Sequence, residues 1–359
     1  MASTAPLILR LVASSVCVSK RAGCIIRDVM KKGELGIVEK AKDDLQTEAD
    51  RSAQRCIIAS LHQQFPKVAI FGEEELDRDP VPADWMEKNL DPDVMKQSLP
   101  EELRNTKDEE IVVWVDPLDG TSEYTQGLLD HVTVLIGIAV NGKSVAGVIY
   151  QPFYNYQAGQ EAKLGRCIWG VIGLGGFGYQ SEPLAEGKNI VVTTRSHGTG
   201  IVAEAVDACE PTEVNRVGGA GSFGVFARGQ LLEKQNIITT TKSHSSEIVR
   251  MAVDACRPTE VVRVGGAGKK VLLLIEGKAN AYVFASPGCK KWDTCAPEAV
   301  LHAAGGRLTD IHGELYQYHP SVQRRNAGGV LATARAQDHQ WYAEKIPDNV
   351  KAALPTAGL

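Results

Sequence analysis

A tandem duplication limits how this chain can fold. Ile190–Gly221 and Ile237–Gly268 are identical at 22 of 32 aligned positions, and the copied block extends over about 177–222 and 223–269. Each copy predicts a strand, a helix and a second strand that ends in Gly-Gly-Ala-Gly. Two copies are too few for a solenoid of stacked repeats. We therefore expect one copy to fill a strand–helix–strand position in a sheet and the other to lie outside it or at an edge.

The flanks of the duplication favour the second copy for that position. Removing either copy leaves a continuous sequence, which is consistent with two alternative exons translated together or joined in a gene model. The second copy alone carries Lys270 two residues after its Gly-Gly-Ala-Gly turn, where the first has Phe223. The second copy also continues directly into the segment that leads to Asp293.

The composition argues against several classes of function. The 359 residues include 39 basic and 44 acidic side chains, for a net charge of −5. A nucleic-acid-binding protein would need a basic face or stripe, which this sequence lacks. The eight cysteines show no Cys-x-x-Cys pair, which predicts reduced thiols in the cytoplasm.

The apolar N-terminal segment predicts a helix that packs on the core. Leu7, Leu11, Val18, Ala22, Ile25 and Val29 recur at roughly helical spacing. The apolar run is interrupted by Arg10, lacks a preceding basic stretch and is too short to span a bilayer. We expect a cytoplasmic monomer without a membrane or nucleic-acid partner.

The first half of the chain predicts mixed α and β structure. Helical periodicity includes Thr47–Phe65, and the continuous apolar run Ile111–Val115 predicts a strand buried on both faces. Asn141-Gly142 joins two further apolar runs, and this dipeptide is a strong hairpin signal. The acid-rich stretch Asp77–Glu110 predicts a solvated excursion with some helix.

The second half alternates strands and helices after Pro152, which favours an α/β arrangement. We predict an α/β protein with an α+β first domain over residues 1–155 and an α/β second domain over residues 156–359. The first domain carries most of the acidic motifs described next. The second contains the duplication.

Three acidic clusters follow or precede predicted elements. "GEEE" follows a short strand, "VDPLDG" places Asp116 and Asp119 at the end of a buried strand, and Asp293 precedes a helix. Singly, these are typical of a solvated face, a tight turn and a helix N-cap. Together they form an all-oxygen set without Cys/His spacing, which favours Mg²⁺ over zinc. Two such ions can activate water for phosphoester hydrolysis.

The motifs "GEE", "DPLDGT" and "WDTCAPE", in this order, resemble those of the lithium-sensitive, Mg²⁺-dependent phosphatases related to inositol monophosphatase. The resemblance extends almost end to end outside the duplication. The stretches "GELGIVEK" and "YVFASPGCKKWDTCAPE" are most similar to the branch that acts on adenosine 3′,5′-bisphosphate. The resemblance implies a layered αβαβα sandwich of the sugar-phosphatase type.

The resemblance also implies roles for individual residues. It makes Glu73, Asp116, Asp119 and Asp293, with the carbonyl of Leu118, ligands of two or three Mg²⁺ ions. Asp50 and Thr121 match the pair that orients and deprotonates the attacking water. Li⁺ is implied to compete with Mg²⁺ near Asp119.

For substrate binding, the resemblance points to the duplicated block. We predict that Thr241, His244, Gly266 and Lys270 of the second copy and its flank bind the nucleotide, because hydroxyl, imidazole and lysine donate to phosphate and glycine lets a ribose or base approach. The equivalent residues of the first copy, Thr194, His197 and Gly219, are the alternative.

The implied reaction converts adenosine 3′,5′-bisphosphate to AMP and phosphate, with inositol 1,4-bisphosphate as a further substrate. A second hypothesis is an inositol mono- or polyphosphate phosphatase, which the metal motifs do not distinguish from the first. A third is a non-catalytic relative whose site is obstructed by the duplicated segment.

Overall fold

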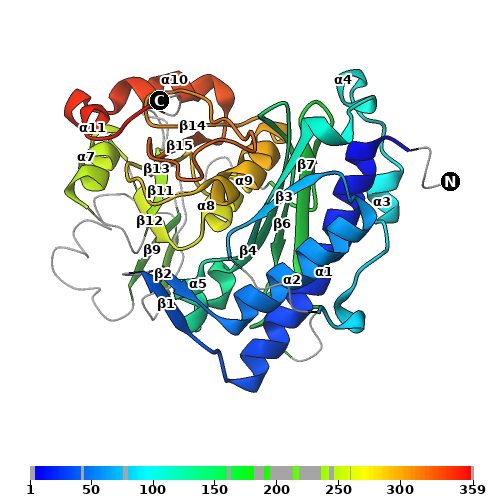
Figure 1. The fold of residues 1–359 in the computed structure, drawn as a ribbon. Helices are drawn as coiled ribbons and strands as arrows, with labels where there is room; N and C mark the ends of the chain where they lie inside the picture. The colour runs from blue at the N-terminus through cyan, green and yellow to red at the C-terminus, as the bar shows by residue number, and fades with distance from the viewer. Residues whose placement is uncertain are drawn as a thin grey trace.

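The elements of the protein stack in five layers. The computed structural model describes residues 5–41, 44–75, 80–159, 163–181, 190–194, 213–217, 236–241, 246–258 and 260–356. Two helices, a six-stranded sheet, two central helices, a five-stranded sheet and an outer group of helices follow one another (Figure 1). The predicted α/β class and αβαβα sandwich are confirmed.

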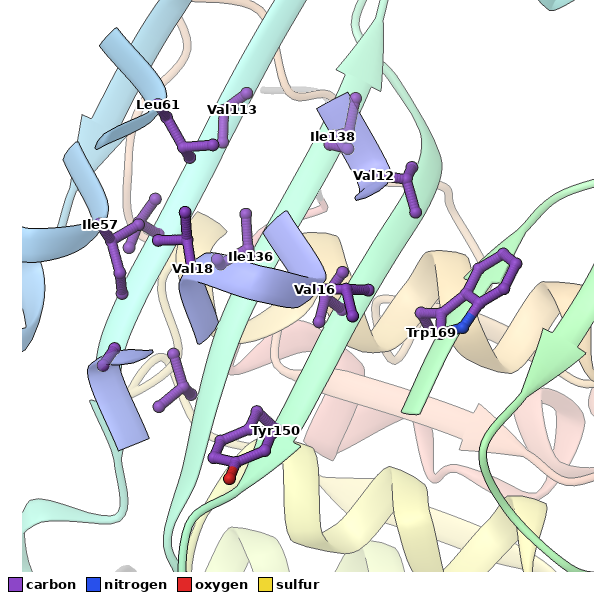
Figure 2. Close-up of a cluster of buried hydrophobic side chains, with 14 of the residues drawn as sticks. Val12, Val16, Val18, Ile57, Leu61, Val113, Ile136, Ile138, Tyr150 and Trp169 are labelled. Carbon is purple, nitrogen blue, oxygen red and sulfur yellow. The ribbon is translucent and has the colours of Figure 1, made fainter. Parts of the chain in front are cut away.

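The first layer consists of α1 (Leu7–Lys32) and α2 (Glu48–Gln64), which pack together against one face of the larger sheet. Figure 2 shows Val16 of α1 and Ile57 of α2 among the side chains of this core. The apolar spacing that predicted α1 is matched by burial. Of the residues that form this spacing, Leu11, Val18, Ala22, Ile25 and Val29 are buried. Within the described residues, no helix combines the length and apolar character that crossing a membrane requires.

The larger sheet has the order β3-β4-β5-β6-β7-β8, with β3 and β4 parallel and the other pairs antiparallel. Its strands are β3 (Ala69–Gly72), β4 (Ile111–Asp119), β5 (Thr133–Val140), β6 (Lys143–Gln151), β7 (Arg166–Val171) and β8 (Gly175–Phe177). Asn141 and Gly142 close the β5–β6 hairpin at φ of 49° and 78°, as predicted for this turn. Because β7 and β8 extend this sheet, a boundary drawn between the two sheets lies after Phe177, not at residue 155. The division into two domains stays a prediction.

The acid-rich segment between β3 and β4 differs from the prediction of a solvated excursion. It contains η2 (Ala83–Trp85), α3 (Pro92–Met95), α4 (Glu101–Arg104) and η3 (Asp108–Glu110). Val94, Leu99 and Leu103 are buried in the same core as α1. These apolar side chains, spaced between the acidic ones, fold the segment back onto the protein.

The central layer consists of α8 (Ala267–Ile275) and α9 (Lys291–Ala303). α9 lies close to the larger sheet because two strand residues facing it lack side chains. A Cβ at Gly137 would lie 2.6 Å from the backbone nitrogen of Ala296, and one at Gly147 would lie 2.5 Å from its carbonyl oxygen. This close approach brings the start of α9 next to the end of β4.

The smaller sheet has the order β12-β11-β13-β15-β14. Its strands are β11 (Ile237–Thr241), β12 (Glu260–Val264), β13 (Ala281–Phe284), β14 (Arg307–Thr309) and β15 (Val330–Thr333). The outer layer contains α7 (Glu247–Ala255), α10 (His339–Lys345), preceded by η5 (Ala336–Asp338), and α11 (Asp348–Ala352). Near the end of β4 lie α5 (Thr121–Thr125), η4 (Leu129–His131) and the β1 (Val38–Ala41) and β2 (Asp44–Gln46) hairpin.

The second copy of the duplication supplies the strand–helix–strand unit of the smaller sheet. Its β11 is parallel to both β12 and β13, and α7 connects β11 to β12. The first copy contributes β9 (Ile190–Thr194) and β10 (Glu213–Val217), which pair with each other in a separate two-stranded parallel sheet. Residues 182–189, 195–212 and 218–222 of the first copy, with His197 and Gly219, lie outside the described residues.

This placement predicts unequal effects of matched substitutions in the two copies. Ile237 and Ile190 occupy equivalent positions, and Ile237 is buried in the core between the sheets. We expect Ile237→Ala to lower the free energy of unfolding by about 2–5 kcal/mol, as for other buried isoleucines. Ile190→Ala should lower it by about 1 kcal/mol or less, because β9 pairs only with β10 among the described strands. Chemical denaturation of both variants measures the difference, and equal losses would contradict the assignment.

Candidate active site

A large cleft opens beside the end of β4. Its volume is about 930 Å³, and residues from both halves of the chain line it. Glu73, Asp119 and Thr121 come from the first half, and Gly266 and Asp293 come from the second. The cleft therefore brings the three acidic motifs together with the Gly-Gly-Ala-Gly turn of the second copy.

Three aspartates form the acidic centre of the site. Carboxylate oxygens of Asp116, Asp119 and Asp293 lie within 4.8 Å of one another. Asp116 and Asp119 lie at the end of β4, where the pairing with β5 shifts register between them. Asp293 is the third residue of α9, and its Oδ2 accepts a hydrogen bond of 2.5 Å from the backbone N–H of Lys290. Asp293 therefore caps the helix from inside its first turn, not from the N-cap position expected of an isolated aspartate.

The environment of these carboxyl groups opposes their ionisation. Burial, and then repulsion from Glu73, raises the pKa of Asp116 well above its usual range. Burial, and then repulsion from Asp119, raises the pKa of Asp293 to about 6. A hard cation with a preference for oxygen ligands would remove this repulsion. The donor set therefore fits Mg²⁺ well.

Glu73 and Glu74 differ in their surroundings although they are adjacent. Glu73 lies in the cleft, where its Oε1 is 3.4 Å from Lys40 Nζ and 3.6 Å from Lys290 Nζ. Burial raises the pKa of Glu73 to about 8. Glu74 is buried, with its carboxylate 2.8 Å from Lys40 and 2.5 Å from the amide of Gln46. The first two glutamates of the run are therefore not part of a solvated face, whereas Glu75 is exposed.

Asp50 and Thr121 meet at the edge of the cleft although 71 positions separate them in the chain. Thr121 Oγ1 donates to Asp50 Oδ1 at 2.9 Å and lies 3.1 Å from the Leu118 carbonyl. The other oxygen of Asp50 accepts from the backbone N–H and hydroxyl of Thr47, the N-cap of α2. Burial raises the pKa of Asp50 to about 6. A hydroxyl held by a carboxyl group with this pKa can pass a proton near neutral pH.

Asp119 also holds the start of α8. Its Oδ1 accepts from the N–H of Ala267 and its Oδ2 from the N–H of Gly268, both at 2.8 Å. The hydroxyl of Thr133, in β5, donates to Oδ2 at 2.6 Å. A carboxylate satisfies the free N–H groups of a helix N-terminus in this way.

The glycines of the second copy make this docking possible. Gly266 has a φ of 69°, and a Cβ at this position would lie 2.9 Å from Asp119 Oδ2. A Cβ at Gly268 would lie 2.5 Å from the hydroxyl of Thr133, and one at Gly265 would overlap the Glu123 carboxylate. These glycines admit the carboxylate and hydroxyl groups of the first half, and Gly265 and Gly266 also line the cleft. That the turn admits a ribose or base stays a prediction.

The described residues place three of the four predicted substrate-binding positions in the cleft. Thr241, Gly266 and Lys270 line it, whereas His244 lies outside the described residues. Lys270 is buried, with its Nζ 2.9 Å from the Gly266 carbonyl and 5.3 Å from the centre of the Tyr282 ring. Of the alternative set, Thr194 is at the end of β9.

The cleft also contains cations to which the sequence pattern did not point. Lys290, Arg324 and Arg325 also line the cleft. The signal for Arg324 and Arg325 is the Arg-Arg pair of "QRRN", which is ordinary for a surface loop, and Lys290 belongs to the Lys-Lys pair that precedes Trp292. Thr133 was likewise missed, because a threonine within a strand carries no sign of a partner 14 residues away.

Comparison with known proteins places this architecture in a family. The model of the "Inositol monophosphatase family" matches residues 10–351. The human "3′(2′),5′-bisphosphate nucleotidase 1" is 49% identical over 355 residues, which cover 99% of this chain and 99% of the relative. The protein of the same name from Rattus norvegicus is 47% identical with the same coverage.

A solved structure shares the fold. The extragenic suppressor protein suhB from Bartonella henselae matches with a TM-score of 0.58 and 17% identity, over 92% of this chain and 96% of that one. Proteins of the matched family are generally Mg²⁺-dependent phosphatases, which agrees with the acidic centre described above. The chain belongs to the inositol monophosphatase family.

Proposed function

We propose that this protein is a Mg²⁺-dependent phosphatase that hydrolyses the 3′-phosphate of adenosine 3′,5′-bisphosphate to give AMP and inorganic phosphate. The observation that carries the proposal is the opening of one cleft onto both the Asp116–Asp119–Asp293 centre and the Asp50–Thr121 pair. The names of the human and rat relatives support the choice of nucleotide. Inositol 1,4-bisphosphate is proposed as a second substrate from the family description.

The chemistry divides between the acidic centre and the proton-transfer pair. Mg²⁺ bound at Asp116, Asp119 and Asp293, with Glu73 and the Leu118 carbonyl as further ligands, would neutralise phosphate charge and lower the pKa of water. We propose two or three such ions. Thr121 Oγ1 orients the attacking water and passes its proton to Asp50 Oδ1, the oxygen that Thr47 does not occupy. The buried position of Asp50 keeps this acceptor within its useful pH range.

For substrate binding we propose Thr241, His244, Gly266 and Lys270, with the first-copy equivalents outside the site. The support is the position of β11 in the smaller sheet and the contact of Asp119 with the start of α8. The alternative of a non-catalytic relative obstructed by the duplicated segment is disfavoured for the second copy, because that copy forms a wall of the cleft. For the first copy the alternative stays open, since most of that copy lies outside the described residues.

We also propose that the protein acts in the cytoplasm as a monomer on this small-molecule substrate. Seven cysteines of the described residues are free thiols, which supports a reducing compartment. Cys56, Cys256 and Cys295 are buried, and burial raises the pKa of Cys256 to about 12. These thiols are therefore unreactive packing groups.

Phosphate release tests the function directly. We expect Mg²⁺-dependent release from adenosine 3′,5′-bisphosphate with higher kcat/KM than from inositol 1-phosphate, and inhibition by Li⁺ that weakens as Mg²⁺ rises. A higher kcat/KM for the inositol monophosphate would move the protein to the sister specificity. An absence of release from every phosphate ester tested would favour the non-catalytic alternative.

The acidic centre predicts that Mg²⁺ stabilises the fold in a pH-dependent manner. The pKa values of about 6 for Asp293 and about 8 for Glu73 in the folded protein are higher than those of carboxyl groups in the unfolded chain. At a pH between the unfolded and folded pKa values, the metal-free folded state therefore binds more protons than the unfolded state. Metal-free stability should therefore fall as pH rises through this window. Mg²⁺ replaces the protons, so it should raise the unfolding temperature more at pH 8 than at pH 6.

Thermal unfolding with chelator and with Mg²⁺ measures this effect. Asp116→Asn should remove most of the Mg²⁺-dependent increment and raise metal-free stability at pH 8, because one buried charge is gone. Asp93→Asn, at an exposed surface position paired with Lys96, should leave the increment unchanged. An increment that is independent of pH and of Asp116 would argue against a metal centre at these residues.

The proton-transfer pair predicts a loss of turnover without a loss of metal. Asp50→Asn and Thr121→Ala should each lower kcat by about 10²–10⁴, the usual contribution of general acid–base catalysis. Thr125→Ala is the matched control. Among the described residues, its hydroxyl bonds only to the Ser122 carbonyl of the same short helix, so the change should leave kcat within about twofold. Mg²⁺-induced stabilisation should persist in all three variants. Near-normal kcat in Thr121→Ala would remove this residue from the mechanism.

A further inference from the structure

Three cations line the same cleft as the Gly-Gly-Ala-Gly turn, and we name Lys290, Arg324 and Arg325 the basic rim. Arg324 and Arg325 are exposed. In the part of the chain that the structure describes, neither guanidinium forms an ion pair with a carboxylate. Arg324 lies over the ring of Phe71, 5.7 Å from its centre, and Phe71 is two residues before Glu73. The rim therefore stands beside the acidic centre with two arginine side chains available to a ligand.

Backbone contacts attach the rim to the element that carries Asp293. Lys290 and Arg325 form an antiparallel bridge, and the N–H of Lys291 donates to the Arg324 carbonyl at 2.7 Å. The side-chain amide of Asn326, which is buried, donates to the Lys290 carbonyl at 2.9 Å and to Thr294 Oγ1 at 2.8 Å. The Nε of Arg325 donates to the Pro287 carbonyl at 2.7 Å. These contacts fix the backbone of the two arginines relative to Asp293.

A substrate with two phosphates needs cations in the cleft away from the acidic centre. The acidic centre repels any anion that no cation neutralises. A phosphate being hydrolysed would lie at that centre, so a second phosphate needs cations elsewhere. Lys270 is buried against Gly266 and Tyr282, where its ammonium group already donates to the Gly266 carbonyl, so it supplies only part of this positive charge. Exposed guanidinium groups bind phosphate through paired hydrogen bonds, which makes the rim arginines the better donors.

We propose that Arg324 and Arg325, with Lys290 beside them, bind the second phosphate of the substrate and make the enzyme selective for bisphosphates over monophosphates. The proposal rests on the proposed function, in which that group is the 5′-phosphate of the nucleotide. The rim leaves the reacting 3′-phosphate to the acidic centre. Selectivity then comes from a charge contact that a monophosphate lacks.

A variant-by-substrate cycle tests this assignment. The double variant Arg324→Gln/Arg325→Gln should lower kcat/KM for adenosine 3′,5′-bisphosphate by about 10- to 100-fold, the usual range for charged hydrogen bonds. The same variant should change kcat/KM for adenosine 3′-monophosphate by about threefold or less. Lys290 is left intact because it contacts Glu73. Arg335→Gln, which removes an exposed arginine paired with Asp338, is the matched control and should affect neither substrate.

A binding measurement separates this proposal from the proposed function. AMP is titrated calorimetrically in Mg²⁺ with excess inorganic phosphate, which occupies the hydrolysis position, and adenosine is titrated in parallel. The double variant should weaken AMP binding about 10-fold or more and leave adenosine binding unchanged. Equal losses of kcat/KM for both nucleotides, or unchanged AMP binding, would overturn the rim assignment. If the wild-type protein releases no phosphate from the bisphosphate, the proposed function fails, and the titration still tests the rim.

Discussion

The carboxylate of Asp119 is the interaction on which the site depends. It lies at the end of β4, and its oxygens accept from Thr133 of the neighbouring strand and from the N–H groups that begin α8. The same side chain belongs to the acidic centre with Asp116 and Asp293. One group therefore positions the wall proposed to bind substrate relative to the centre proposed to bind metal. The absence of side chains at Gly266 and Gly268 is what allows the contact.

Two further acidic residues are placed by a shared device. Asp50 and Asp293 are each the third residue of a helix, and each accepts the backbone N–H of its own N-cap residue. The positive end of the helix dipole compensates part of the cost of a buried carboxylate. The second oxygen of Asp50 is left for Thr121, and Asp293 joins the acidic centre. Helix capping thus supplies both the local structure and the orientation of the functional groups.

The negative charge of this centre explains why cations lie near it. The pKa values of Asp116, Asp293 and Glu73 are all raised by burial and mutual repulsion. Lys40 and Lys290 approach Glu73 from different elements, and Arg324 and Arg325 stand at the cleft wall. A site that binds both metal ions and phosphate groups needs carboxylates for the metal ions and cations for the phosphates. The two sets must be far enough apart that they do not neutralise each other.

Much of this arrangement was determined by the sequence alone. Local rules predicted α1 from its apolar spacing, the β5–β6 hairpin from Asn141-Gly142, and the burial of β4 from its continuous apolar run. The order of the three acidic motifs predicted the family and the αβαβα layers, and the flanks of the duplication favoured the second copy. These inferences succeeded because each depends on neighbouring residues or on an ordered set of motifs.

Tertiary structure decided what local patterns do not encode. Glu74 looks like part of a solvated run, yet its carboxylate is buried against Lys40 and Gln46. The larger sheet extends to Phe177 because β7 pairs with β6 and β8 pairs with β7, and no change in composition along the chain marks that end. The partnership of Asp119 with the start of α8, and the presence of Arg324 and Arg325 in the same cleft, join segments more than 140 residues apart. Such contacts follow from how the layers stack. That stacking depends on glycines without side chains, which let α9 approach the larger sheet and let the start of α8 approach Asp119.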